Sequence, residues 1–133
     1  VDGQIMSNIK EYLGFHSTAL SLRAKRNDIL ASNIANAATP NFKARDIDFS
    51  AEMNKANKLG QLDVTDSGHI KTFSSKRGDR TLYRDPINPS LDGNTVELSV
   101  EQMEFSENVM RYQTTLTFLN NKISGLMSAI RGE

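Results

Sequence analysis

The sequence contains no cysteine and no tryptophan, and only three of its 133 residues are proline. Without cysteine the chain can form neither a disulfide framework nor a thiolate metal site, although this absence does not indicate a compartment. Sixteen basic and sixteen acidic residues cancel, so net charge gives no argument for binding nucleic acid or acidic membranes. Hydrophobic residues make up 38%, below the usual share, which indicates a thin core completed by an extended shape or by neighbouring subunits.

Long apolar runs are missing as well. The sequence has no stretch of about 18 apolar residues, the length that a helix needs to span a bilayer. The first residues, Val1 to Met6, lack the basic start and the apolar run of a secretory signal peptide. If the protein leaves the cytoplasm, we therefore expect another export route.

Patterns that carry catalysis are also absent. The sequence has no P-loop, no dinucleotide-binding glycine motif and no nucleophile elbow. Of the two histidines, we interpret His16 as a packed or interface residue and His69 as a solvated residue in a turn, because His16 has no second ligand one helical turn away. The sequence thus predicts a protein that is not an enzyme and that uses no cofactor or metal.

Charged clusters have ordinary interpretations. The acidic pairs are interpreted as solvated carboxylates or as favourable charge at a helix N-terminus, rather than as general acid and base; they are Asp46 with Asp48 and Glu101 with Glu104. The short basic cluster around Lys25 has no interleaved aromatic residues, which argues against nucleic-acid binding.

The C-terminal segment carries an unbroken heptad row of large residues, which predicts a helix from Val100 to Ile130, about 45 Å long. Ser99 followed by Gln102 matches the capping box that starts such a helix. The row consists of Phe105, Val109, Tyr112, Leu116, Leu119, Ile123, Leu126 and Ile130.

The N-terminal segment has a matching row in which small and large residues alternate, so that another helix can approach closely. A second stripe lies on nearly the opposite side, which indicates burial on two sides. The helix is expected to end just before Pro40. The first row is Leu13, Ser17, Leu20, Ala24, Asn27, Ala31, Ile34 and Ala38, and the stripe is Phe15, Ala19, Leu22 and Ile29.

Charge is scarce on both segments. Between Tyr112 and Ile130 the one charged residue is Lys122, and between Ile29 and Phe42 there is none. A helix exposed to water normally carries charge on its outer face. The uncharged outer faces favour packing between copies, although a single stable helical hairpin remains the alternative.

Residues 42–96 form an inserted, loop-rich segment. We expect a short helix at 50–58 with Ser50 as its N-cap, short strands at Leu62–Val64 and Ile70–Phe73, and a turn-rich extended run from Asp85 to Asn94. Together with terminal helices in residues 1–41 and 97–133, this gives a mainly α fold. Its long N- and C-terminal helices pair as an antiparallel coiled coil, and the middle contains little regular structure.

The stretch Ala31 to Arg45 reads Ala-Ser-Asn-Ile-Ala-Asn-Ala-Ala-Thr-Pro-Asn-Phe-Lys-Ala-Arg and closely resembles the N-terminal signature of bacterial flagellar rod and hook proteins. That family's motif reads roughly A-x-N-I-A-N-x-x-T-P-G-Y. This sequence has Asn41 in place of the glycine and Phe42 in place of the tyrosine. Asparagine tolerates the left-handed conformation, so the turn is retained. The downstream runs Tyr83–Pro86 and Pro89–Leu98, together with the chain length, are similar to the proximal rod member.

The resemblance implies a structural subunit of the proximal rod in the periplasm, self-assembling into a helical tube that transmits torque. It implies export through the flagellar type III apparatus. Implied neighbours are further copies, FliE and the MS-ring protein FliF below, and the rod proteins FlgC and FlgF above. Two alternatives stay open: a soluble helical adaptor or export chaperone of the flagellar system, and an enzyme such as a peptidoglycan hydrolase, which would need a paired-carboxylate cleft.

These observations predict two sets of site residues. Packing within one subunit is assigned to Leu13, Leu20, Ile34, Val109, Leu116, Leu119, Ile123 and Leu126. Contacts between subunits are assigned to Phe15, Leu22, Ile29, Asn33, Asn36, Thr39, Pro40, Phe42, Asn120 and Asn121.

Overall fold

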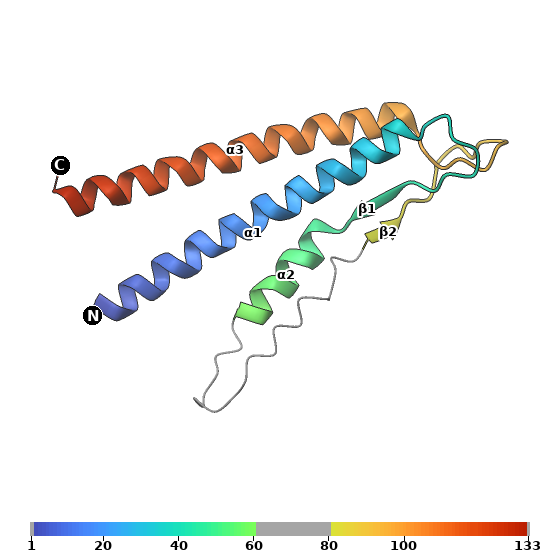
Figure 1. The fold of residues 1–133 in the computed structure, drawn as a ribbon. Helices are drawn as coiled ribbons and strands as arrows, with labels where there is room; N and C mark the ends of the chain where they lie inside the picture. Colours follow the sequence, from blue (N-terminus) through green and yellow to red (C-terminus); the bar gives the residue numbers. More distant parts are fainter. Residues whose placement is uncertain (1, 61–80, 133) are drawn as a thin grey trace.

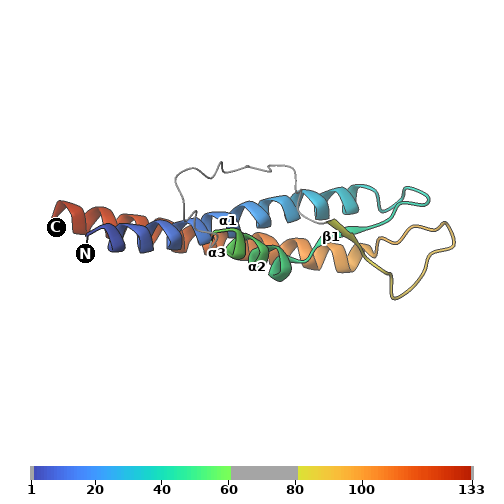
Figure 2. The ribbon, with the colours of Figure 1, turned by 90° about the horizontal axis from the view of Figure 1, so that it is seen from below.

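Two long antiparallel helices dominate the computed structural model, which describes residues 2–60 and 81–132 (Figure 1). Both chain ends lie at one end of the helix pair, and the turns after α1 and before α3 lie at the other, as the two views show (Figure 2). The elements are α1 (Asp2–Ala35), β1 (Arg45–Ile47), α2 (Phe49–Gly60), β2 (Thr81–Tyr83) and α3 (Leu98–Arg131). The predicted mainly α fold with a loop-rich middle is confirmed. The two strands expected at 62–64 and 70–73 lie outside the described residues.

Helix α1 ends at Ala35, earlier than the end before Pro40 that the sequence predicted. A side chain from far along the sequence holds the turn that follows this end. The Nδ2 group of Asn94 donates to the carbonyls of Asn36, Ala37 and Thr39 at 3.0, 3.0 and 2.8 Å. Carbonyls at a helix C-terminus lack partners within the helix, so this amide satisfies groups that would otherwise be left without a donor.

Helix α3 begins without the predicted capping box. Its N-cap is Glu97, whose side chain makes no capping hydrogen bond, and Ser99 and Gln102 lie exposed inside the helix. The Glu97 carboxylate instead accepts a hydrogen bond of 2.8 Å from the backbone N–H of Ile87. The cap residue therefore fixes the incoming loop rather than the first helical turn.

Helix α2 begins one residue before the predicted Ser50. Asp48 is its cap, because the Asp48 carboxylate accepts a hydrogen bond of 3.1 Å from the N–H of Ala51. The helix packs on α1, where Met53 joins Ala19 and Leu22 in a small apolar cluster that Phe49 covers. The second apolar stripe predicted on α1 is thus occupied by α2 around Ala19 and Leu22.

Strands β1 and β2 form an antiparallel pair that the sequence analysis missed. Arg45 pairs with Tyr83 and Ile47 with Thr81, and the N–H of Arg84 extends the pairing to the carbonyl of Ala44 at 2.9 Å. Each strand has only three residues, too few to show the alternation by which strands are recognised.

The α1–α3 interface buries polar residues in the half nearest the turn after α1. In α3 the fully buried side chains are Glu101 and Asn108, and in α1 they include Leu30 and Asn33. Leu116 and Ile123, which the sequence placed in this interface, are 37% and 39% exposed. The side of α3 that faces α1 is therefore rotated relative to the predicted heptad row. Among the described residues, none of the helices combines the length and hydropathy needed to cross a membrane.

The turn after α1 is tied to the segment before α3. This junction comprises residues 36–44 and 92–96. The N–H of Asn41 donates to the carbonyl of Asp92 at 2.9 Å, and the N–H of Thr95 donates to the carbonyl of Phe42 at 3.0 Å. Asn41 has φ of 60°, so the predicted left-handed turn at this position is confirmed. Opposite it lies Gly93, with φ of 75°.

Replacing Gly93 with alanine is expected to destabilise the chain by about 1–2 kcal/mol, because an L-residue is strained at this φ. In addition, the new Cβ would lie 2.5 Å from Oδ1 of Asn41. Urea unfolding followed by circular dichroism measures the change. The matched control is Gly125→Ala, inside α3, where a Cβ meets nothing within 4 Å. It should be neutral or stabilising by up to about 1 kcal/mol. Equal effects of the two substitutions would contradict the role given to Gly93.

Candidate functional site

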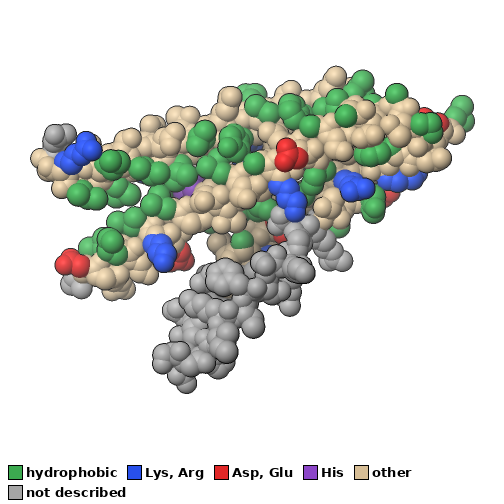
Figure 3. Space-filling model, in the orientation of Figure 1, with side chains coloured by type: hydrophobic (Ala, Val, Ile, Leu, Met, Phe, Trp, Pro, Cys, Tyr) green, Lys and Arg blue, Asp and Glu red, His purple; other side chains and the backbone are tan. Residues whose placement is uncertain are grey.

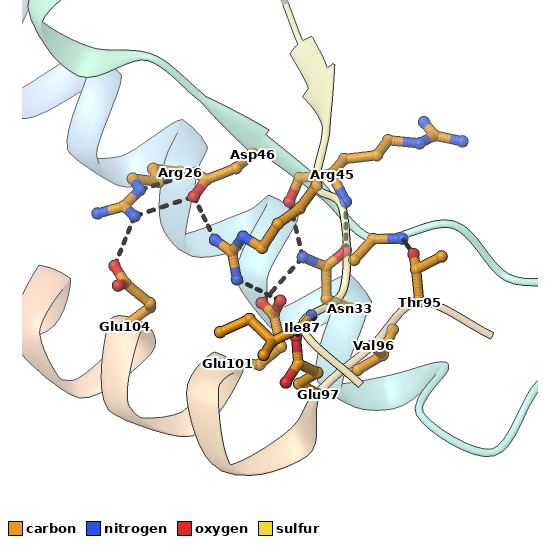
Figure 4. A network of polar contacts seen from close by, with 12 residues as sticks. Arg26, Asn33, Arg45, Asp46, Ile87, Thr95, Val96, Glu97, Glu101 and Glu104 are labelled. Atoms are coloured by element: carbon orange, nitrogen blue, oxygen red, sulfur yellow. Dashed lines mark hydrogen bonds and ion pairs between the residues drawn. The ribbon is translucent and has the colours of Figure 1, made fainter. Parts of the chain in front are cut away.

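Charged side chains from four parts of the chain converge where α1, β1, the segment after β2 and α3 meet (Figure 4). Arg26 of α1 binds Asp46 of β1 through two parallel hydrogen bonds of 2.9 and 3.0 Å. The same guanidinium reaches Glu104 of α3 at 2.7 Å. Bidentate arginine–carboxylate pairs fix orientation as well as distance, so this contact sets how β1 lies on the two helices.

Arg84, the residue after β2, joins the two halves of this polar network. One of its terminal nitrogens donates to Asp46 and the other to Glu101. The Glu101 side chain is only 1% exposed, whereas those of Arg84 and Asp46 are about one-fifth exposed. A carboxylate buried this deeply needs a positive partner and further hydrogen bonds.

Asn33 supplies the remaining contacts. Its amide nitrogen donates to Glu101 at 3.0 Å and to the carbonyl of Arg45 at 2.7 Å. Its amide oxygen accepts the N–H of Arg45 at 3.1 Å. Through this one buried side chain, α1 is bonded both to the backbone of β1 and to the buried acid of α3. The polar network thus comprises Arg26, Asn33, Asp46, Arg84, Glu101 and Glu104.

The surroundings shift the pKa values of the two central acids, Glu101 and Asp46, in opposite directions. Burial raises the pKa of Glu101 above its ordinary value, more than Asn33 and Arg84 lower it. Burial also acts to raise the pKa of Asp46, but hydrogen bonds from Arg26, Arg84 and the N–H of Ile47 outweigh it and lower the value. The hydrogen bond to Asp46 raises the pKa of Arg26. Asp46 is therefore the acid whose ionisation the fold stabilises.

This arrangement holds elements together rather than presenting a reactive group. Each central carboxylate is bonded by arginine, and within the part of the chain that the structure describes no three histidine, cysteine or acidic side chains are placed to hold a metal ion. The interpretation as solvated carboxylates is wrong for Asp46 and Glu101, which are bonded by arginine and largely buried. The alternative, favourable charge at a helix N-terminus, is confirmed for Glu101 in the first turn of α3 and for Asp48, which caps α2. Sequence patterns could not reveal the partners of the acids in the network, because Arg26 and Glu104 are 78 residues apart.

The half of the helix pair nearest the chain ends has a different surface. Figure 3 shows hydrophobic side chains gathered along both long helices on the visible face. His16 packs against three rings, with centroid distances of 4.7 Å to Tyr12, 5.4 Å to Phe15 and 5.1 Å to Phe118. The predicted packing role of His16 is therefore confirmed.

Large apolar side chains nevertheless stay exposed on this half. Phe15 and Phe118 are 42% and 41% exposed, and Met127 and Ile130 are 47% and 85% exposed. Single exposed apolar residues are normal, but a series of them is typical of an interaction surface where charge is scarce. On α3 charge is scarce here, since Lys122 is the one charged residue between Tyr112 and Ile130.

The predicted site residues divide into three groups. Leu22 and Asn33, expected between subunits, are buried within the chain, so that assignment is wrong for both; Met53 covers the first, and Glu101 and Arg45 bind the second. Half-buried are Leu13, Leu20, Ile29, Ile34, Asn36, Phe42, Val109, Leu119 and Leu126. Exposed are Phe15, Thr39, Pro40, Leu116, Asn120, Asn121 and Ile123.

The comparisons with known proteins agree with one another. Residues 13–43 match the family model described as "Flagella basal body rod protein". "Flagellar basal body rod protein FlgB" from Cereibacter sphaeroides is 56% identical over 96% of this chain and 100% of its own length. The protein of the same name from Aeromonas hydrophila is 48% identical over 90% of this chain and 92% of its own. The protein of that name from Salmonella typhimurium is 42% identical over 96% of this chain and 99% of its own length.

Asp46→Asn is expected to destabilise the chain by about 2–3 kcal/mol, because two arginines lose their shared charged partner in a site only about one-fifth exposed. Urea unfolding measures the loss. The matched control is Glu107→Gln, which breaks the exposed pair with Arg111. Its cost should stay below about 0.5 kcal/mol. If the two variants lose the same amount, the network does not hold the junction.

The pH dependence of stability follows from the same acid. The pKa of Asp46 is lower in the folded chain than in the unfolded chain, where it is near the ordinary value of about 3.9, so acid protonates the unfolded chain first. Stability contributed by Asp46 is therefore present above about pH 5 and lost as the pH falls through the folded pKa. Glu101 acts in the opposite sense, since its raised pKa favours folding when it is protonated. Unfolding in urea between about pH 5 and pH 2 should show a smaller loss in Asp46→Asn than in the parent. If the free energy of unfolding falls equally with pH in the variant and the parent, Asp46 is not the source of the acid sensitivity.

Proposed function

The chain belongs to the FlgB family of flagellar basal body rod proteins, and from this membership we propose how its two long helices build the rod. The protein is a structural subunit of the basal-body rod, located in the periplasm, and is not an enzyme. Within that role, we assign it to the proximal rod and assign its surfaces to contacts within and between subunits.

The observation that carries the assignment is the contrast between the two ends of the helix pair. At the junction end, polar contacts satisfy most buried groups within one chain. At the end near the termini, apolar side chains of both helices are exposed, and Lys122 is the one charge between Tyr112 and Ile130. We propose that neighbouring subunits cover the apolar side chains of this second end. The first end has its shape fixed within the free chain and offers neighbours its outer residues, such as Thr39 and Pro40, which are exposed.

The proposed contacts between subunits keep most of the residues that the sequence suggested. They are Phe15, Ile29, Asn36, Thr39, Pro40, Phe42, Asn120 and Asn121, without the two residues buried inside the chain. The half-buried residues Leu13, Leu20, Ile34, Val109, Leu119 and Leu126 are assigned to helix packing within the subunit. Contacts on two different sides of a subunit are heterologous, so copies add in a helical array instead of closing as a dimer. Torque then passes through many interlocked side chains.

Family membership supports association with other rod and basal-body components, and we infer the individual neighbours from it. Further copies lie beside each subunit, FliE and the MS-ring protein FliF lie below, and FlgC and FlgF lie above. The flagellar type III apparatus exports the chain. A soluble adaptor or export chaperone is not favoured, because its helices would need charged outer faces.

Met127→Asp tests the proposed surface. Met127 is 47% exposed, so the free energy of unfolding of the isolated chain should change by less than about 0.5 kcal/mol. Swimming and recovery of complete basal bodies should nevertheless be lost, because a charge would be buried between subunits. The control is Ser106→Asp, which places the same charge at an exposed position in the charged half of α3. Cells carrying Met127→Asp that swim normally, with the variant exported and incorporated, would contradict the assignment.

A further inference from the structure

Helix α3 carries two alternative heptad rows that lie one residue apart. Both use Phe105, Tyr112, Leu119 and Leu126. The apolar row adds Val109, Leu116, Ile123 and Ile130, whereas the polar row adds Glu101, Asn108, Thr115 and Lys122. Either combination has the alternating spacing of three and four residues that a paired helix requires.

From Glu101 to Thr115 the chain pairs α1 with the polar row, whereas Lys122, the next member of that row, is exposed. Glu101 and Asn108 are fully buried and Thr115 is half-buried. Leu116 and Ile123 are more than a third exposed, and Ile130 is 85% exposed. Burial of apolar surface alone favours the other choice, so specific polar contacts must select the one observed.

Asn108 provides such a contact. Its amide nitrogen donates to the carbonyl of Arg23 at 2.8 Å and to the side-chain oxygen of Asn27 at 2.9 Å. Both acceptors sit at one height on α1, so a rotation or a slide of α3 breaks the two bonds together. A buried asparagine is known to fix the register of paired helices in this way, at a cost in stability.

The contact has a visible cost here. The side-chain oxygen of Asn108 is buried and accepts no hydrogen bond from the residues that the structure describes. The Nε of Arg23 is likewise buried without an acceptor among those residues. Buried polar atoms without partners destabilise a fold. An apolar pair at this position would therefore hold the two helices together more strongly.

The alternative packing is within reach of a small change in twist. A straight helix drifts by about 20° per heptad relative to a strict 3.5-residue repeat. From Glu101, which the polar network holds, to Thr115 is two heptads, so the drift amounts to about 40°. One residue of a helix turns by roughly 100°. Because the two rows share every second member, α3 must rotate about its axis by only about half of this, about 50°, to replace the polar row by the apolar row. The lower half of α3 can thus bring Leu116 against α1 while Glu101 stays bound.

We propose that the asparagine layer, Asn27 with Asn108, is a register-determining contact that keeps the apolar row of α3 turned outward. The outward row then remains available to a helix of a neighbouring copy, and this second part rests on the proposed function. The layer lowers the stability of the free chain and preserves the surface that assembly uses.

The test replaces both members, Asn27→Leu with Asn108→Leu, in the full-length chain. The free energy of unfolding should rise, because two polar groups are replaced together and neither is left unpaired. The control Asn108→Ala removes one partner and should lower it. A purely structural polar contact would be weakened by both changes, so the opposite signs identify a register-determining contact.

Cysteine labelling reports the rotation directly, since the natural chain has no cysteine. Leu116→Cys should react with a maleimide several-fold more slowly in the double-leucine background than in the parent. Met110→Cys, at a position 68% exposed on α3, should react equally in both. Swimming should be reduced in the double-leucine strain despite its greater stability.

Two results would overturn the register proposal: a double-leucine chain that is less stable than the parent, or a Leu116→Cys substitution that reacts at the same rate in both backgrounds. Both measurements use the isolated chain, so that failure leaves the rod function untouched. A parent chain that never enters basal bodies would instead refute the proposed function while the labelling result stands.

Discussion

Glu101 is an acid buried in the contact between two helices, and the arrangement of the junction follows from the need to neutralise it. Arg84 supplies the charge and Asn33 supplies a neutral donor. Arg84 cannot reach Glu101 unless β2 pairs with β1, and β1 is held in place by the two hydrogen bonds between Asn33 and Arg45. Two strands of three residues would not be stable alone. They persist because the buried acid fixes one of them and Asn33 fixes the other.

The same network places α2. Asp46 is bonded by Arg26 and Arg84, and two residues later Asp48 caps the helix that packs on α1. The apolar cluster beneath α2 is small, so its orientation depends on this covalent continuity with a fixed strand as well as on burial. Because Asp48 follows the fixed strand β1 directly, the polar network also determines where α2 begins.

Sequence patterns revealed the long helices and the turn after α1, because both are encoded locally. Heptad spacing, proline and the motif around Asn41 need no knowledge of distant residues. The polar network could not be predicted this way, since each of its contacts joins segments distant in sequence, such as Arg84 with Asp46. The orientation of α3 was missed for a related reason. Periodicity identified the more apolar of two adjacent rows, and the choice between them depends on whether a distant residue such as Asn33 or Asn27 can bond the polar one.

Asn33, Asn36 and Asn41 all belong to the motif that resembles the rod and hook signature, and each has a defined role in the geometry of the junction. Asn33 joins α1 to β1 and α3, Asn36 bonds back to the last turn of α1, and Asn41 forms the left-handed turn. The family model matches residues 13–43, the segment that contains these side chains together with Arg26. A signature of this kind specifies how the chain reverses at the junction. The exposed apolar side chains of α3 near the chain ends, such as Met127 and Ile130, lie outside the matched segment. The segment that identifies the family therefore shapes the junction, and it leaves the apolar face of α3 to be specified by other residues.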